Sequence, residues 1–290
     1  MQSSRRSVSG ADARRSRASC ALAIGGLDPG GGAGLAADLR GIEAAGAFGC
    51  AVAAVVTVQS TSGLRSSFAL KARDVLAQAR EVVVHQRVRA IKTGALGSEA
   101  NVRAVGELLA AHKAIPAIVD PVMLPTRGRG RLLAERAVGA MRSALLPRAA
   151  LITANVPEAE ALTGARVTNV SEAHDAALAL CKLGARAALV KGGHMTGAQS
   201  VDVLVLREGV NGMSTTAIEL RAKRLRLPPI HGGGCTFAAL VAGHVAADAH
   251  DYEEEGADVV LDAVKWAKKL HHRMLAAARD VGGDMRVLVP

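Results

Sequence analysis

The sequence predicts an α/β domain with three layers (αβα), in which a mostly parallel central sheet is covered by helices on both faces. Short apolar runs alternate along the chain with longer segments in which apolar residues recur at helical spacing. This alternation is typical of βαβ units. Half of the 290 residues are hydrophobic, which is enough for one large core. We therefore expect a single domain over residues 20–290.

Six runs are expected to form strands, because each is short, apolar and bounded by polar or glycine-rich sequence. They are residues 21–26, 50–58, 88–94, 114–120, 149–155 and 187–193. The segments between them include four with the spacing of helices that cover a sheet, residues 35–46, 100–112, 157–164 and 171–184. Parallel strands need such crossover helices.

The alternation of strand and helix segments ends after the sixth apolar run. Residues 203–227 are predicted to form a β-hairpin with Asn211 and Gly212 near its turn, followed by another extended piece. Two further helices are expected over residues 236–249 and 256–279. The second is amphipathic, and His271 and His272 are expected on its solvated face.

Polar or glycine-rich residues follow nearly every expected strand at its carboxyl end. They are Asp28-Pro29-Gly30-Gly31-Gly32, Gln59, Lys92-Thr93-Gly94, Asp120-Pro121, Asn155 with Glu158, and Lys191-Gly192-Gly193-His194. Ligands of open parallel sheets bind outside the carboxyl ends of the strands. The expected sheet therefore predicts where the site lies before its chemistry is known.

The first nineteen residues differ in composition from the rest of the chain. They are rich in serine and contain five arginines against one aspartate. This is typical of a disordered extension and also of an organelle transit peptide. Composition favours the disordered extension, over residues 1–19.

The cysteines and the hydropathy pattern indicate the cellular compartment of the protein. No apolar run approaches the ~18 uninterrupted residues that a membrane helix requires, so we expect a soluble protein with no membrane partner. The four cysteines, Cys20, Cys50, Cys181 and Cys235, lack metal-type spacing. Free thiols suit a reducing compartment, and the cytoplasm is the expected location.

The formal charge of +10 raises the question of nucleic-acid binding. The arginine-rich first nineteen residues contribute part of that charge. Single-strand binders also need aromatic side chains for base stacking, and the chain has few: Phe48, Phe68, Phe237, Tyr252 and Trp266. Nucleic acid is therefore not an expected partner.

Two glycine-rich turns, at residues 30–34 and 232–234, precede expected helices, where backbone N–H groups and the helix dipole favour an anion. A P-loop is excluded because Gly-Lys occurs nowhere in the chain. Residues 32–37 match a dinucleotide fingerprint only formally, since the next strand carries no acidic residue and ends in Gln59. A phosphate site of another architecture remains, and the structural alternative is a tight turn with Cys235 in the core.

Seven segments carry a more specific signal. They are residues 24–38, 47–50, 58–61, 91–94, 119–123, 152–159 and 190–194, which read IGGLDPGGGAGLAAD, AFGC, VQST, IKTG, VDPVM, ITANVPEA and VKGGH. In order and spacing they resemble the hydroxymethylpyrimidine/phosphomethylpyrimidine kinases of thiamin biosynthesis, over about residues 21–246.

That family has the ribokinase-like fold, and its members are usually dimers. They use ATP with a divalent ion to phosphorylate the hydroxymethyl group of 4-amino-5-hydroxymethyl-2-methylpyrimidine, and then phosphorylate the monophosphate. The resemblance therefore implies a phosphotransferase with ATP and Mg²⁺ as cofactors, a small-molecule pyrimidine as substrate, and a homodimer.

The resemblance also implies roles for particular residues. On the substrate side, Gln59 would hydrogen-bond the aminopyrimidine, and three residues would line the same pocket: Asp38, Val122 and Ala95. On the phosphate side, Asn155 and Glu158 would organise the triphosphate and magnesium. Asp120 would support that network, and Lys191 would face phosphate. An anion hole would be formed by the backbone N–H groups of Gly232, Gly233 and Gly234.

Cys235 stands where most ribokinase-like sugar kinases have a catalytic Asp. A helix N-terminus lowers the pKa of a thiol from its ordinary value of ~8.5. We therefore expect a thiolate that accepts the proton of the substrate hydroxyl. Phosphoryl transfer otherwise needs positioning and charge neutralisation, which the backbone N–H groups, the metal and Lys191 would supply.

The chain departs from the family pattern around the expected site. Gly233 and Ile230 replace threonines, and Leu27 stands where Ser or Thr is usual. Ala95 replaces a methionine and should enlarge the pyrimidine pocket. The flap reads Pro125-Thr126-Arg127-Gly128 in place of Ala-Lys-Ser-Gly, so Arg127 or Arg129 would have to replace the lysine charge.

These departures leave two alternatives to the pyrimidine kinase. The first is a vitamin B6 kinase that acts on pyridoxal or pyridoxine, which a wider pocket favours. The second is a catalytically weak homologue that binds the pyrimidine or a nucleotide, which the altered flap and the lost hydroxyls favour.

Overall fold

The computed structural model describes residues 18–128, 132–134, 136–208, 214–248 and 252–290. The extension predicted over residues 1–19 lies almost entirely outside these ranges and stays a prediction. The expected turn at Asn211 and Gly212 and the flap residue Arg129 also lie outside the described residues.

Within the described ranges, nine strands form one sheet in the order β3-β2-β1-β4-β5-β6-β7-β8-β9. The strands are β1 (Cys20–Leu27), β2 (Phe48–Ser60), β3 (Gly63–Ala69), β4 (Val88–Thr93), β5 (Ala117–Val119), β6 (Leu151–Asn155), β7 (Ala187–Lys191), β8 (Gln199–Glu208) and β9 (Ser214–Lys223). The strands from β2 to β7 in this order pair in parallel, and β3, β8 and β9 join at the two edges as antiparallel strands. The predicted mostly parallel sheet and the predicted hairpin are both confirmed.

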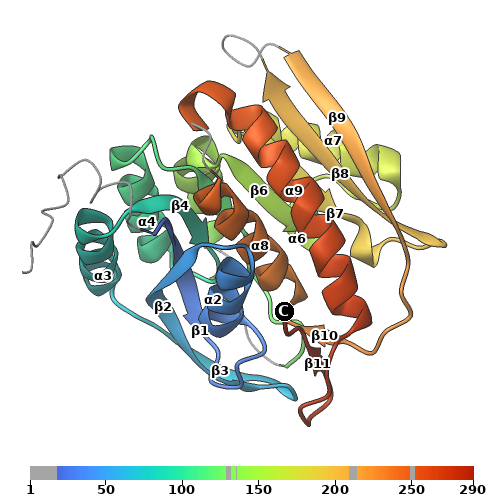
Figure 1. The fold of residues 1–290 in the computed structure, drawn as a ribbon, viewed down its shortest axis with the longest axis horizontal. Coiled ribbons are helices and arrows are strands. Elements are labelled where there is room, and N and C mark those ends of the chain that lie inside the picture. Colours follow the sequence, from blue (N-terminus) through green and yellow to red (C-terminus); the bar gives the residue numbers. More distant parts are fainter. Residues whose placement is uncertain (1–17, 129–131, 135, 209–213, 249–251) are drawn as a thin grey trace, which may run out of the picture.

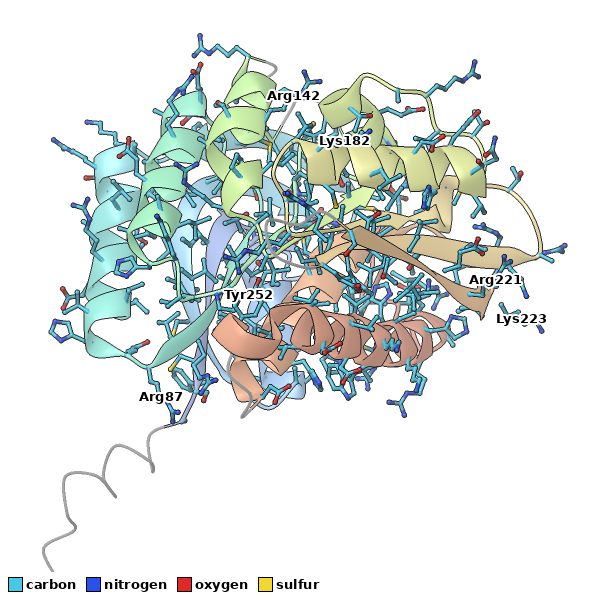
Figure 2. All side chains as sticks on the ribbon, turned by 90° about the horizontal axis from the view of Figure 1, so that it is seen from above. Arg87, Arg142, Lys182, Arg221, Lys223 and Tyr252 are labelled. Carbon is cyan, nitrogen blue, oxygen red and sulfur yellow. The ribbon has the colours of Figure 1, made fainter. Side chains whose placement is uncertain are left out.

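Helices cover both faces of the sheet, as Figures 1 and 2 show. The helices of the described chain are α2 (Gly34–Ala44), α3 (Ala72–His85), α4 (Glu99–Ala111), α5 (Ala137–Ala140), α6 (Val156–Thr163), α7 (Val170–Lys182), α8 (Gly233–Ala247) and α9 (Tyr252–Ala276). One hydrophobic core joins the sheet to α3 through α7, and a second joins it to α2, α8 and α9. Side chains of β1 alternate between them, with Leu22 and Ile24 in the first core and Ala21 and Ala23 in the second. The predicted three-layer αβα architecture is confirmed.

Helix α8 determines the position of the late glycine turn. Ten of its 15 residues are buried, and its sequence is apolar on all sides, as is typical of a helix enclosed by protein. It packs against α2, α9 and the central strands. Because α8 is held on several sides, the loop at its start has a fixed place at the carboxyl ends of the strands.

Several elements of the fold were not expected from the sequence. The edge strand β3 and the helix α3 were not predicted, and neither was the small parallel pair of β10 (Ile230–His231) and β11 (Arg286–Val287). None of the described helices combines the length and the apolar character that crossing a membrane would take.

Candidate active site

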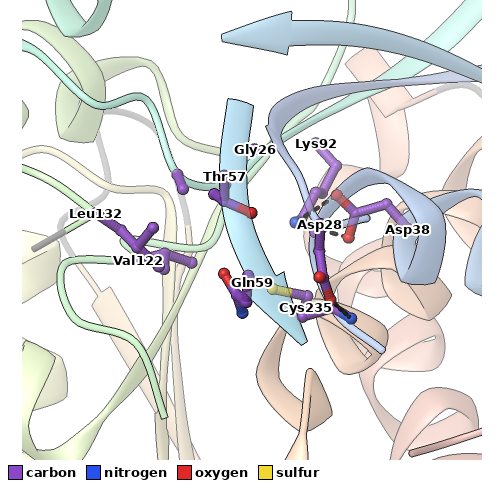
Figure 3. Close-up of a pocket in the computed structure, with 13 residues that line it drawn as sticks. Gly26, Asp28, Asp38, Thr57, Gln59, Lys92, Val122, Leu132 and Cys235 are labelled. Atoms are coloured by element: carbon purple, nitrogen blue, oxygen red, sulfur yellow. Dashed lines mark hydrogen bonds and ion pairs between the residues drawn. The ribbon is translucent and has the colours of Figure 1, made fainter. Parts of the chain in front are cut away.

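A small cavity lies at the carboxyl ends of the parallel strands, where the sheet predicted a site (Figure 3). Its walls come from β1, β2 and β4, the early glycine-rich loop, α2, the segment after β5 and the first turn of α8. The residues that line it are Gly26, Asp28, Ala33, Gly34, Asp38, Thr57, Gln59, Lys92, Gly94, Ala95, Val122, Leu132 and Cys235. All four residues predicted to contact the substrate are among them, and so is Cys235.

The early glycine-rich loop is held by the buried carboxylate of Asp28. Its Oδ1 accepts a hydrogen bond from the N–H of Gly30, and its Oδ2 accepts one from the N–H of Ala33, both at 2.9 Å. Burial alone would raise the pKa of Asp28, but the hydrogen bonds from His231, Ala33 and Gly30 outweigh burial and lower it. At Gly34 the backbone φ is +54°, and a Cβ would collide with the carbonyl oxygen of Gly26, so only glycine fits there.

His231 joins Asp28 to the predicted substrate residue Gln59. The imidazole Nε2 lies 2.8 Å from Oδ2 of Asp28 and 3.2 Å from the side-chain amide of Gln59. His231 and Asp28 are both buried. The pair therefore connects the early loop, the residue before the late loop and the wall of the cavity.

Asp38 forms a closed ion pair with Lys92. Nζ of Lys92 donates to both carboxylate oxygens, at 2.8 and 2.9 Å, and both side chains are 1% exposed. Burial raises the pKa of Asp38 to about 6, although Lys92 opposes the shift. Burial alone would lower the pKa of Lys92, but the charge of Asp38 raises it above its ordinary value. At neutral pH this wall of the cavity therefore holds a carboxylate and an ammonium group.

The late loop begins with Gly232 and leads directly into α8. Gly232 has a φ of +78°, and a Cβ there would collide with the carbonyl oxygen of Gly32, so the two glycine-rich loops touch backbone to backbone. No side chain caps the start of α8. The first N–H groups of a helix have no partner within it, so the loop can offer them to an anion.

His271 of α9 supports this loop from behind, which corrects the prediction that it lies on a solvated face. Its Nε2 donates to the carbonyl oxygen of Gly233 at 2.9 Å, and its ring packs edge-on against Phe237. Burial lowers the pKa of His271 to about 4, so the ring is neutral. His271 is half-buried because it contacts Gly233 and Phe237 of α8.

Cys235 lies in the first turn of α8, but the expected lowering of its pKa is wrong. Burial raises the pKa of the thiol to about 12; Lys92 and the N–H of Gly34 oppose the shift, and Asp120 and Asp38 add to it. Burial and two nearby carboxylates both disfavour the charged thiolate. In this structure Cys235 is a neutral thiol at the edge of the cavity.

The predicted phosphate residues lie on the other side of the late loop. Nζ of Lys191 is 3.3 Å from Oδ1 of Asp120, while the buried Oδ2 of Asp120 has no hydrogen-bond partner. A Cβ on Gly234 would lie 3.3 Å from that Nζ, so the ammonium group is next to the loop. Burial alone would lower the pKa of Lys191, but Asp120 and Glu158 raise it.

Asn155 and Glu158 start helix α6 with a reciprocal capping box. Oδ1 of Asn155 accepts from the N–H of Glu158, and the N–H of Asn155 donates to Oε2 of Glu158, both at 2.9 Å. Burial raises the pKa of Glu158 to about 7; Lys191 opposes the shift, and Asp120 adds to it. A carboxylate of this kind gains by binding a cation.

The structure therefore brings the predicted residues together in two adjoining groups around Cys235. Sequence reasoning placed Lys92 at this end of the sheet but gave it no role, and it missed His231 and His271 as residues that hold the site. A lysine inside the apolar run VRAIKTG was the one available signal for Lys92. In the flap, Arg127 is paired with Asp284 at 3.5 Å, and Arg129 is outside the described residues.

Comparisons with known proteins agree with this geometry. The family model described as phosphomethylpyrimidine kinase matches residues 28–287. The hydroxymethylpyrimidine/phosphomethylpyrimidine kinase of Streptomyces coelicolor is 39% identical over 91% of this chain and 91% of its own length. The Escherichia coli enzyme of the same name is 36% identical over 85% of this chain and 88% of its own.

Solved structures show the same fold. A Bacillus subtilis pyridoxal kinase in complex with ADP has a TM-score of 0.80 at 26% identity and covers 94% of this chain and 97% of its own. A phosphomethylpyrimidine kinase from Clostridium difficile has a TM-score of 0.71 at 29% identity, over 88% of this chain and 98% of its own. These matches and the cavity together confirm the predicted resemblance and the ribokinase-like fold: the chain belongs to the phosphomethylpyrimidine kinase family of phosphotransferases.

Proposed function

We propose that the protein transfers a phosphoryl group from ATP to the hydroxymethyl group of 4-amino-5-hydroxymethyl-2-methylpyrimidine, and then to the resulting monophosphate. The observation that carries this proposal is the place of the late loop. It lies between a small cavity with polar and apolar walls and a lysine–carboxylate group suited to phosphate. The uncapped start of α8 is next to both the cavity and the lysine–carboxylate group.

The cavity suits a small aromatic ring. Ala95, Val122 and Leu132 offer apolar contact, and Gln59 offers an amide. Such a combination, mostly apolar with a few placed polar groups, is typical of small-molecule sites. We propose that the ring packs against the apolar wall while its hydroxymethyl group points towards Cys235.

The late loop would hold the charge that develops on the phosphoryl group. The backbone N–H groups of Gly232, Gly233 and Gly234 form the proposed anion hole, and Lys191 adds a positive charge beside it. Donors fixed in place before the reaction stabilise a transition state without reorganisation. The glycines keep side chains out of the space that a phosphoryl group needs.

We further propose that Glu158 holds Mg²⁺ together with phosphate oxygens, with Asn155 and Asp120 nearby. The unpartnered Oδ2 of Asp120 and the raised pKa of Glu158 both suit the binding of a cation. Among the described residues no cluster of three or more His, Cys, Asp or Glu side chains could hold a metal, so phosphate and water would supply most ligands. When bound, Mg²⁺ would neutralise charge on the triphosphate.

Cys235 contacts the acceptor hydroxyl in this proposal, now as a thiol and not as a thiolate. Kinase transition states are loose, so the acceptor oxygen need not lose its proton before transfer begins. The neutral thiol can orient the hydroxyl by hydrogen bonding. Its role is positioning at the reacting atoms.

The proposal is tested by measuring ADP release with the hydroxymethylpyrimidine, its monophosphate and pyridoxal as acceptors, each with ATP and Mg²⁺. We expect turnover of both pyrimidines. Failure of both would overturn the proposed function. Faster turnover of pyridoxal would instead support the vitamin B6 kinase, which the small side chain of Ala95 and the fold similarity to pyridoxal kinases favour.

We also propose that the protein is a homodimer in a reducing compartment such as the cytoplasm. Val56 and Phe68 pair across β2 and β3, and these two side chains and Val58 are exposed on the edge of the sheet. Contiguous exposed apolar side chains mark association surfaces. All four cysteines are free thiols. Light scattering on the purified chain, with Phe68→Ser as the variant, tests the dimer.

A further inference from the structure

His231 has contacts that phosphoryl transfer does not explain. It is 2% exposed and lies behind Gln59, outside the cavity lining. Its Nε2 approaches both Oδ2 of Asp28, at 2.8 Å, and the amide nitrogen of Gln59, at 3.2 Å. Its Nδ1 is buried and has no hydrogen-bond partner.

The carboxylate of Asp28 decides where the imidazole carries its proton. Asp28 accepts from two backbone N–H groups, and its pKa is lowered, so it is ionised and can only accept. Nε2 of His231 must therefore donate. The other neutral tautomer would set a lone pair against the carboxylate and bury an Nδ1–H group without an acceptor, which is costly.

The proton on Nε2 in turn decides the orientation of Gln59. An N–H donor of the imidazole and an NH₂ donor of the amide, 3.2 Å apart, cannot form a hydrogen bond. The two ends of a Gln amide have nearly the same shape, and their assignment follows from their partners. The conflict disappears when the amide oxygen faces His231, and the NH₂ group then takes the other position.

We propose that Asp28 and His231 are positioning residues that hold the amide of Gln59 with its oxygen on the imidazole and its NH₂ group towards the cavity. The site thereby selects acceptor rings that present a nitrogen lone pair to this donor. One end of the amide contacts a buried imidazole, so the end left for the cavity is the NH₂ group. This inference rests on the proposed function, because it names what that function selects.

The kinetic test compares the hydroxymethylpyrimidine with its two analogues in which one ring nitrogen is replaced by C–H. We expect the wild-type chain to favour the pyrimidine over one analogue by at least about tenfold in kcat/KM, since a buried donor would be left unpaired. In His231→Phe the ring still packs on Gly32, but the amide can turn. The preference should then fall several-fold through KM, with kcat changing little.

Val287→Ala is the matched control. Val287 pairs with His231 across β10 and β11 and also approaches Gly32, and its side chain has no group that could hydrogen-bond the amide of Gln59. It should keep the wild-type preference. An equal preference in wild type and His231→Phe, or none in wild type, would overturn the inference while leaving the proposed function intact.

A measurement without substrate tests the inference about His231 independently of the proposed function. The ¹⁵N NMR signals of the His231 imidazole, assigned by their loss in His231→Phe, report which nitrogen carries the proton. A proton on Nε2 supports the inference, and a proton on Nδ1 alone overturns it. If the wild-type chain turns over neither pyrimidine, the proposed function fails and this measurement still decides the inference.

Discussion

Two lysine–aspartate ion pairs, Lys92 with Asp38 and Lys191 with Asp120, lie on either side of Cys235. They differ in how many of their hydrogen-bonding atoms have a partner. Lys92 donates to both oxygens of Asp38 at 2.8 and 2.9 Å, and solvent is excluded from both. Lys191 approaches a single oxygen of Asp120 at 3.3 Å and is 15% exposed, while the other oxygen has no partner. The first pair is complete without a ligand, whereas the second has hydrogen-bonding capacity left for one.

This difference suggests a division of labour. A complete buried pair fixes the shape of the cavity, and removing one partner leaves a buried charge without compensation. An incomplete pair contributes less to folding but can be completed by phosphate and a cation. Four experiments test this contrast, beginning with the variant whose effect should be strongest.

Lys92→Met should cost about 3–5 kcal/mol in the free energy of unfolding, because it leaves the carboxylate of Asp38 buried and alone. Urea denaturation measures this directly. The double variant Lys92→Met with Asp38→Asn removes both charges and should recover much of the loss. A loss below about 1 kcal/mol for the single variant would mean that the pair is not closed.

Lys191→Met should affect catalysis more than folding. Loss of a preorganised positive charge at the transferring group is expected to lower kcat by about 10²–10³-fold. The exposed Lys182 in the last turn of α7 provides the matched control, and Lys182→Met should behave as wild type. A fall in unfolding free energy as large as that of Lys92→Met would erase the contrast between the pairs.

His271→Phe tests the late loop that lies between the two pairs. It removes the donor to the carbonyl of Gly233 but keeps an aromatic ring against Phe237. Kcat should fall about fivefold, in line with ~1 kcal/mol for one hydrogen bond, with little change in KM for the pyrimidine. His272→Phe serves as control, and equal effects of the two variants would argue against support of the loop by His271.

Cys235 should show no ionisation over the range in which the enzyme is assayed. With the pKa of its thiol raised to about 12, the group stays protonated at pH 7 and is deprotonated only as the pH rises towards that value. Alkylation by iodoacetamide should therefore increase steadily with pH up to at least 9.5, with no plateau. A plateau below pH 9 would show that Cys235 is fully ionised there, and it would contradict the role of the neutral thiol.

The architecture could be predicted from the sequence because buried parallel strands are apolar along their whole length. The runs that became β1 and β5 show this clearly. The edge strand β3, with sequence GLRSSFA, could not be found in this way because most of its residues are exposed or half-buried. Helix α3 buries only Val75 and Ala79 fully, so its apolar stripe is narrow.

The positions of the site residues could be predicted, but their partners could not. Parallel topology placed Gln59, Asp120 and Lys191 at one edge of the sheet without any knowledge of chemistry. The partners of Lys92 and His271 were missed because each lies on a distant segment: Asp38 is 54 residues away from Lys92, and Gly233 is 38 residues away from His271. The raised pKa of Cys235 depends on the same long-range contacts.

The pairing of β10 with β11 makes the site depend on a strand that the ribosome synthesises near the end of this sequence. His231 is in β10, and its strand partner Val287 also packs beside Gly32 of the early loop. A growing polypeptide that has not yet reached Arg286 lacks the strand that aligns His231. Premature stop codons or C-terminal trimming before that point should therefore yield molecules with an intact central sheet and an impaired site. The β11 strand thus contributes to the alignment of the site although it lies far from the sheet residues in sequence.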